Sequence, residues 1–350
     1  MPYRKHGINP RLISIATGKS LADIPASPPP SQLPGAYAKL FSPQIEELAE
    51  LPGRKYMLSC QSCGKKGEYG VGMIAFNAQE YEKAAGKDCN PLDHFQFSGY
   101  FRCKHCNSAG SWDYPSHTKQ DLMFAIMGSS ILSQFKEQSD VVFGKLATYD
   151  GKSFTWATET EEYYLDKLQA DPRDAWIWNR LGNHYSKGGR PDLAVVAFQQ
   201  STHHDPNQFE SHFSLGRLLY EARYKQEALV HLRQALKSGR EYTKMPPLEL
   251  REGLAAALQI LYAIHRDPQK VVDEIVNLPK GDNFQPSSNV IMLNFQLHFD
   301  SAQGLYPLAE TLMGHQQDEI PKSEQAISLP KARPVHPKQK KPPKKKSKKR

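Results

Sequence analysis

The sequence lacks an uninterrupted apolar run of the roughly 18 residues that a membrane-spanning helix needs, and residues 1–30 hold no apolar stretch of signal-peptide length. We therefore expect a cytoplasmic protein, or a nuclear one if its source is a eukaryote. A GxxxxGK[ST] nucleotide loop, an HExxH motif and a GxSxG nucleophile elbow are also missing. We expect no enzymatic activity. The alternative is an active site in the insertion between the two cysteine pairs described below.

Acidic residues are absent from the C-terminal stretch 331–350, which carries 11 of the 45 Lys and Arg. Residues 1–330 hold the other 34 together with all 37 acidic residues, so the net charge of +8 is a property of the tail. Lysine runs alternate with proline there, a composition that stays unfolded. We expect residues 321–350 to be disordered, and residues 331–350 to attract RNA or DNA by charge. Nuclear import and solubility are the alternatives.

Cysteine is scarce, and all five cysteines lie between positions 60 and 106. Cys60 and Cys63 form one CxxC, and Cys103 and Cys106 form another, each where a β-like run meets a turn. Two residues between cysteines let a tight turn aim both thiolates at one point, and two such turns supply the four sulfurs that zinc prefers. The arrangement resembles a zinc ribbon, and the resemblance implies that these four cysteines ligate one structural Zn²⁺.

Other interpretations of the cysteines are a redox CxxC, a pair of disulfides and incidental buried thiols. A redox motif normally opens a helix in a βαβ unit, and disulfides suit secreted proteins. The stretch between the pairs, positions 64–102, is longer than the roughly 15–20 residues of the compact pattern, so we expect an insertion around residues 81–94 to loop out of the ribbon. Cys89, His94 and His105 either add to the ligand set or are incidental.

A repeat begins at Trp178. The spacing Trp178-x2-Leu181-Gly182-x2-Tyr185, then Ala194-x3-Phe198, then Pro206, matches the tetratricopeptide repeat pattern. A second copy follows one period of about 34 residues later, with Leu215, Gly216, Ala228 and Leu232 in register, and a half repeat precedes the first. The chain resembles tetratricopeptide repeat (TPR) proteins. The resemblance implies helical pairs stacked into a curved solenoid, with core glycines and alanines that let the helices approach.

In this family the first helix of each repeat lines a concave face that binds a segment of a partner protein. The resemblance places six residues on that face: Trp176, Asn179, Asn183, Phe213, Arg217 and Tyr220. Amide and guanidinium groups beside aromatic rings suit an extended or helical peptide. The alternative is that some of these side chains pack against other parts of the same chain.

These observations predict an α+β multidomain protein, with a zinc-ribbon-like β module before an all-α TPR-type solenoid and disordered ends. The expected divisions are a flexible Pro-rich arm (1–50), the zinc-ribbon-like module with its insertion (51–117), a connecting helix (120–135) and a β-hairpin turning at Asp150-Gly151 (118–157 together), the helical repeats (158–280), C-terminal helices or a cap (281–320) and the basic tail (321–350). The expected function is that of an adaptor that binds a protein in the concave groove. The alternative is a nucleic-acid or ribonucleoprotein-associated factor that uses the tail and the ribbon.

Overall fold

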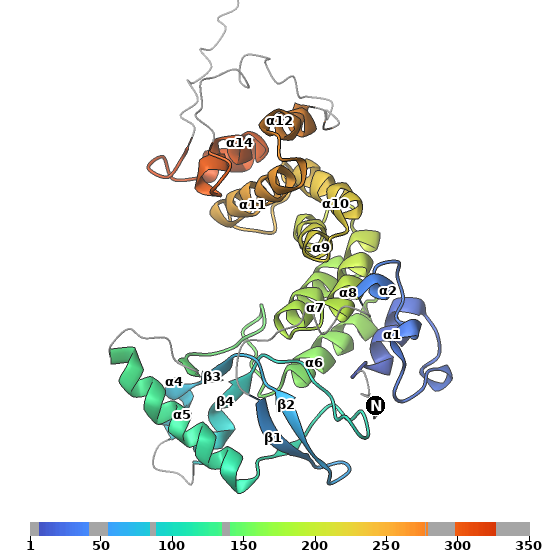
Figure 1. Ribbon diagram of the computed structural model, residues 1–350, viewed down its shortest axis with the longest axis vertical. Coiled ribbons are helices and arrows are strands. Elements are labelled where there is room, and N and C mark those ends of the chain that lie inside the picture. Colours follow the sequence, from blue (N-terminus) through green and yellow to red (C-terminus); the bar gives the residue numbers. More distant parts are fainter. Residues whose placement is uncertain are drawn as a thin grey trace, which may run out of the picture.

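The structure, a computed structural model, describes residues 7–41, 55–84, 89–134, 141–276, 278 and 298–326. Figure 1 shows a β-rich module at one end, followed by helices in a curved row that leads to a helical C-terminal region. The mixed α+β class is therefore confirmed, with small sheets near the N-terminus. Most of the expected basic tail, residues 327–350, lies outside the described residues.

The β-rich module contains two three-stranded sheets. The first has the order β2-β1-β5, with Tyr56 of β1 opposite Tyr69 of β2 and Cys60 opposite Trp112 of β5. The second has the order β4-β3-β6. The expected insertion, residues 81–94, lies between β3 and β4; its described residues include the end of α4 and a 3-10 helix, Pro91–His94. The strands and the short helix are β1 (Lys55–Cys60), β2 (Lys66–Gly70), β3 (Ile74–Phe76), α4 (Ala78–Ala84), β4 (Phe95–Phe97), β5 (Trp112–Asp113) and β6 (Val141–Phe143).

The connecting helix is observed as α5 (Ser116–Gln134), which begins slightly earlier than predicted. The hairpin prediction over residues 141–156 is wrong. The chain does turn at Asp150-Gly151, where the Thr148 N–H donates to the Lys152 carbonyl at 2.7 Å. However, β6 pairs in parallel with β3 and buries Val141 completely, because the open edge of β3 offers a partner in an existing sheet.

The helical region repeats its own boundaries. The helices α7 (Ala175–Lys187) and α9 (Phe209–Glu221) have equal lengths, as do α8 (Pro191–His204) and α10 (Lys225–Ser238), and both kinds of helix recur after the same interval. Close packing within each pair needs a glycine, since a Cβ on Gly182 would lie 2.5 Å from the Phe198 ring. The flanking helices are α6 (Ala157–Ala170), α11 (Pro247–His265) and α12 (Pro268–Val276).

The N-terminal segment, residues 7–41, is not the flexible arm that its composition suggested. Its helices α1 (Pro10–Thr17) and α2 (Ala38–Phe41) pack against α6 and α8 respectively. Leu12 and Phe41 are at most 1% exposed in the same core as the repeats. The apolar residues responsible are scattered between prolines, so they form no periodic pattern, yet each finds a site on the helices.

One buried carboxylate joins three parts of the chain. Glu161 of α6 is fully buried and accepts hydrogen bonds from Asn9 Nδ2 at 3.0 Å, the Tyr100 hydroxyl at 2.8 Å, Arg102 Nη1 at 2.8 Å and the Tyr185 hydroxyl at 2.6 Å. Burial, followed by the charge of Glu161, raises the pKa of both tyrosines well above the usual value. The N-terminal segment, the β-rich module and α7 therefore converge on α6 through one polar network.

At the other end, the C-terminal segment packs on α11 through α14 (Tyr306–Thr311) and two short 3-10 helices, Gln303–Leu305 and Gly314–Glu319. Arg251 of α11 donates to Glu310 at 3.0 Å, and both side chains are buried. Glu310 also accepts from the Ala326 N–H at 2.8 Å. Order therefore extends into the first residues of the expected disordered tail.

A chain of hydrogen bonds ties Tyr37, just before α2, to the repeats and predicts acid sensitivity. His212 Nε2 lies 3.1 Å from the Pro206 carbonyl, His212 Nδ1 lies 3.0 Å from His231 Nδ1, and His231 Nε2 lies 3.0 Å from the Tyr37 hydroxyl. Two neutral imidazoles satisfy this chain with one proton between each pair of atoms. Burial lowers the pKa of each histidine to about 4; the hydrogen bond to the Pro206 carbonyl and then the charge of Asp205 act in the opposite direction on the pKa of His212.

Because the unfolded histidines take up protons near pH 6.5 and the folded ones only near pH 4, the free energy of unfolding should fall as the pH drops from about 6.5 to 4. Each histidine contributes at most about 1.4 kcal/mol per pH unit in that window. Urea unfolding at pH 7.5, 6.0 and 5.0 measures this slope. His231→Asn should make the slope shallower, whereas His315→Gln, at an exposed position, should not. Equal slopes in the parent and His231→Asn would contradict the assignment.

Candidate metal centre

Two backbone turns of the same design hold the four cysteines. In the first, the Cys60 N–H donates to the Lys65 carbonyl and the Gly64 N–H donates to the Cys60 carbonyl, at 3.0 and 2.7 Å. In the second, the Cys103 N–H donates to the Ser108 carbonyl and the Asn107 N–H to the Cys103 carbonyl, at 3.0 and 2.9 Å. Gly64 and Asn107 both have positive φ, of 72° and 62°, the backbone conformation that closes each turn.

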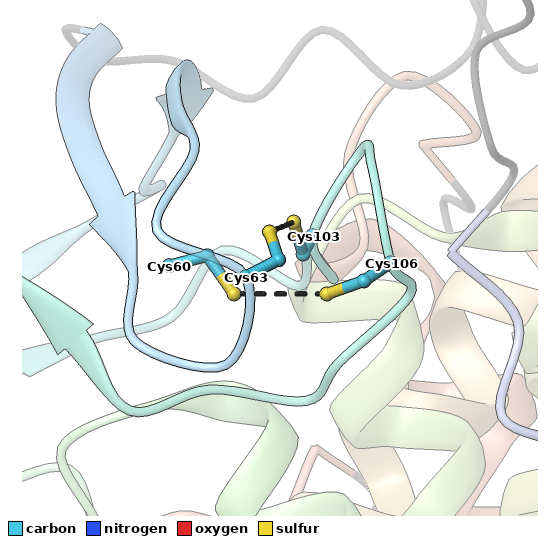
Figure 2. Close-up of side chains that lie close together, drawn as sticks. All are labelled: Cys60, Cys63, Cys103 and Cys106. Carbon is cyan, nitrogen blue, oxygen red and sulfur yellow. Dashed lines mark hydrogen bonds between the residues drawn. The ribbon is translucent and has the colours of Figure 1, made fainter.

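The turns bring the four predicted ligands together. All four Sγ atoms lie within 4.8 Å of one another. Figure 2 shows the cysteines pointing into one space. The sulfurs of Cys60 and Cys106 are 3.7 Å apart, as are those of Cys63 and Cys103. Each close pair joins one turn to the other. The geometry is compatible with a structural metal site and with the predicted zinc ribbon.

The pKa values of three of the clustered thiols are shifted, and not all in the same direction. Burial raises the pKa of Cys103, but backbone N–H groups of Cys106 and His105 outweigh it and lower the pKa to about 7. Burial, with the neighbouring sulfurs, raises the pKa of Cys106 to about 12. Burial also raises the pKa of Cys60. Four thiolates this close repel one another, and a bound metal ion removes that repulsion by replacing the thiol protons.

The remaining candidate ligands lie outside the cluster. Cys89 Sγ is 3.0 Å from His94 Nε2, in a separate contact beside Phe76 and Tyr81. The N–H of His105 donates to Cys103 Sγ at 3.4 Å. Within the described residues, the group of side chains able to hold a metal consists of the two CxxC pairs. The site has four protein ligands, so a tetrahedral ion would have no open position for a substrate.

Two residues that support the site were not predicted. Asn107 is 3% exposed, and its Nδ2 donates to the carbonyls of Ile8 and Ala26 at 2.9 and 2.8 Å, which fixes the second turn to the N-terminal segment. Arg102 donates to the Asn107 carbonyl at 3.0 Å as well as to Glu161. An Asn one position after a CxxC, where the first pair has Gly64, is the signal that could have indicated a left-handed turn.

The predicted concave-face residues divide into two groups. Asn179 is fully buried and donates to the Ser211 hydroxyl at 2.7 Å, so it belongs to the α7–α9 contact and is corrected as a partner-binding candidate. The other five are partly exposed on α7 and α9, and we call them the inner-face residues: Trp176, Asn183, Phe213, Arg217 and Tyr220.

The inner-face residues contact side chains of α7, of α9 and of the loop before α6. The Arg180 guanidinium lies 4.0 Å from the centre of the Trp176 ring and forms an ion pair with Glu210. Tyr149, from the loop before α6, meets Trp176 edge to face at 6.4 Å. Arg217 is 3.4 Å from Glu221. The positive charges on this face are therefore paired, and its character is aromatic and amide-rich.

Comparison with models of known protein families finds no match, and no curated protein matches the chain significantly. Across the ranges that the structure describes, no helix combines the length and apolar character needed to cross a membrane.

Proposed function

We propose that the chain is a non-enzymatic adaptor, in which a zinc-ribbon-like module is joined to a TPR-type solenoid whose inner-face residues bind a protein partner. The observation that carries the proposal is the recurrence of a whole helical pair, boundaries included, from α7 and α8 to α9 and α10. The repeat interval of about 34 residues, with glycine at equivalent positions 182 and 216 in each first helix, is typical of TPR arrays.

Zinc is the proposed metal. Four sulfurs at 2.3 Å from a tetrahedral Zn²⁺ are about 3.8 Å apart, and the two closest pairs here are 3.7 Å apart. Thiolates select soft or borderline ions over Mg²⁺ or Ca²⁺. One ion would be held by Cys60, Cys63, Cys103 and Cys106. It would fix the two turns and the end of β1, and binding to other molecules would take place at the surface of the protein.

The choice of the inner face rests on which surfaces the chain already covers. The N-terminal segment packs on α6 and α8, and its Tyr37 reaches His231 of α10. In Figure 1, α7 lies on the side of α8 away from α2. The chain itself therefore covers part of α8 and reaches α10 at His231, whereas α7 and α9 carry the partly exposed rings and amides. Their partly exposed rings and amides suit a peptide backbone with apolar side chains.

The inner-face proposal predicts loss of partner on mutation. Asn183→Ala with Arg217→Ala should reduce the amount of co-purifying protein partner at least about tenfold, a loss of roughly 1.4 kcal/mol in binding. Lys187→Ala with Lys225→Ala is the matched control, since both lysines are exposed on neighbouring positions of the same helical pairs. Quantitative mass spectrometry after affinity capture makes the comparison. Unchanged recovery with the inner-face variant would refute the assignment.

The basic tail supports a second candidate function, association with nucleic acid or ribonucleoprotein, because its 11 positive charges are unopposed. Binding through the tail should weaken steeply with salt and disappear after nuclease treatment or after truncation to residues 1–330. Recovery of one protein partner after both treatments supports the adaptor. Loss of the captured proteins after either treatment supports the alternative.

A further inference from the structure

Exposed apolar side chains in the described part of the molecule gather at one place. Of nine large hydrophobic side chains that are exposed there, five lie on α5 and the adjoining β6. Contiguous apolar surface, unlike single exposed residues, marks an interaction site. The five are Met123 (36% exposed), Phe124 (67%), Met127 (60%), Val142 (48%) and Phe143 (41%).

The opposite side of α5 already has a role within the chain. Thr118 and Leu122 are each 1% exposed, and Ser129 is 2% exposed. The Thr118 hydroxyl donates to the Met57 carbonyl of β1 at 2.8 Å, and the Ser129 hydroxyl accepts from the Val141 N–H at 3.3 Å. The helix is therefore anchored to both sheets by one face, and the apolar face that carries Phe124 and Met127 is directed away from them.

The charge pattern of α5 restricts what can cover this face. Residues 122–134 contain no Lys, Arg, Asp or Glu. This stretch offers no positive charge to the phosphates of a nucleic acid. A charged protein surface would lose its hydration here without gaining an ion pair. The occupant must therefore offer an uncharged apolar face of its own, which a second copy of α5 does without like-charge repulsion.

Gly128 points to a second copy in particular. It lies one turn after Phe124, and a Cβ placed on it would meet no atom within 4 Å, so the fold of the single chain does not require a glycine there. Glycine weakens a helix interior relative to alanine. When two copies of one helix pair antiparallel about a twofold axis near Ile126, position 124 of each lies opposite position 128 of the other.

We propose that α5 forms a symmetric homodimer contact, in which the Phe124 ring of each chain packs over Gly128 of its partner and Met123 and Met127 close the sides. Val142 and Phe143 of the adjoining β6 are also exposed, on opposite faces of that strand. Figure 1 shows α5 along the outer edge of the β-rich module, well separated from α9 and α11. The dimer would therefore leave the helical pairs of both chains accessible.

Sedimentation velocity of the full chain over a range of micromolar concentrations, with its metal bound, tests the proposal. We expect a monomer–dimer equilibrium. Because the contact is uncharged, its dissociation constant should stay within about twofold between 0.1 and 0.5 M salt, where contacts made through the basic tail would weaken steeply.

Phe124→Glu with Met127→Glu should raise the dissociation constant at least about tenfold. Gly128→Leu should do the same by filling the space for the partner ring, and it leaves the fold intact because that space is open within the chain. Val230→Glu, at a 59% exposed position on α10, is the matched control and should still dimerise. The proposal is overturned if the parent chain is a monomer, even if its α5 then binds a different protein. It is also overturned if the Gly128→Leu variant still forms the dimer.

Discussion

The Cys60→Ser, Cys103→Ser double variant is expected to retain less than about a tenth of the zinc bound by the parent chain, which should hold close to one ion. The two replacements remove one sulfur from each turn, so neither close sulfur pair survives. Zinc binding in small modules supplies roughly 10–16 kcal/mol of apparent free energy that folding depends on. The β2-β1-β5 sheet should therefore lose its fixed packing, seen as loss of near-ultraviolet dichroism from Trp112.

The control for this prediction is Cys89→Ser, because Cys89 contacts His94 and lies outside the four-sulfur cluster. That variant should keep the full zinc content and the same unfolding midpoint. Zinc content is measured by atomic emission after dialysis against a metal-free buffer. Full zinc content in the double variant would rule out the cluster as the metal site, and loss in Cys89→Ser would extend the ligand set.

Glu161→Gln is expected to destabilise the protein by roughly 3–5 kcal/mol, because it leaves the buried Arg102 guanidinium without its closest counter-charge. An amide oxygen also cannot replace a carboxylate that accepts hydrogen bonds from four side chains. Chemical denaturation with the metal bound measures the change. Residues 7–41 should become accessible to protease first, since the hydrogen bond of Asn9 to residue 161 is weakened and the bond to Glu162 remains.

Glu221→Gln is the matched comparison for Glu161→Gln. Glu221 forms an ion pair with Arg217 that is nearly half exposed, and such surface pairs contribute less than about 1 kcal/mol. If both variants change the free energy of unfolding by the same small amount, the buried network does not hold the three parts of the chain together.

The features predicted from sequence were those encoded by short spacings. Two residues between cysteines were enough to predict that each turn aims two sulfurs at one point, since the turn that joins them is local. The regular period identified the helical pairs because Gly182 and Phe198 must meet in the first copy, as Gly216 and Leu232 must in the second. Where residues close in sequence fix the geometry, a single sequence carries the information.

The features that were missed depend on contacts between distant segments. Asn9 meets Glu161 across 152 positions, and His231 meets Tyr37 across 194, so neither the packing of the N-terminal segment nor its polar network leaves a local pattern. The parallel pairing of β6 with β3 could likewise not be predicted, because strands close in sequence are expected to pair as hairpins. Asn179 has the spacing of an inner-face residue, and its burial follows from Ser211 on the next helical pair.

The most direct test of the adaptor is site-specific photo-crosslinking in cells. A photoreactive phenylalanine analogue at Phe213, a partly exposed inner-face residue, is compared with the same analogue at Leu21, which is 49% exposed in the N-terminal segment. We predict a discrete nuclease-resistant adduct with one protein from position 213 and none from position 21. Equal adducts from both positions, or none from position 213 while the partner still co-purifies, would contradict partner binding by the inner face.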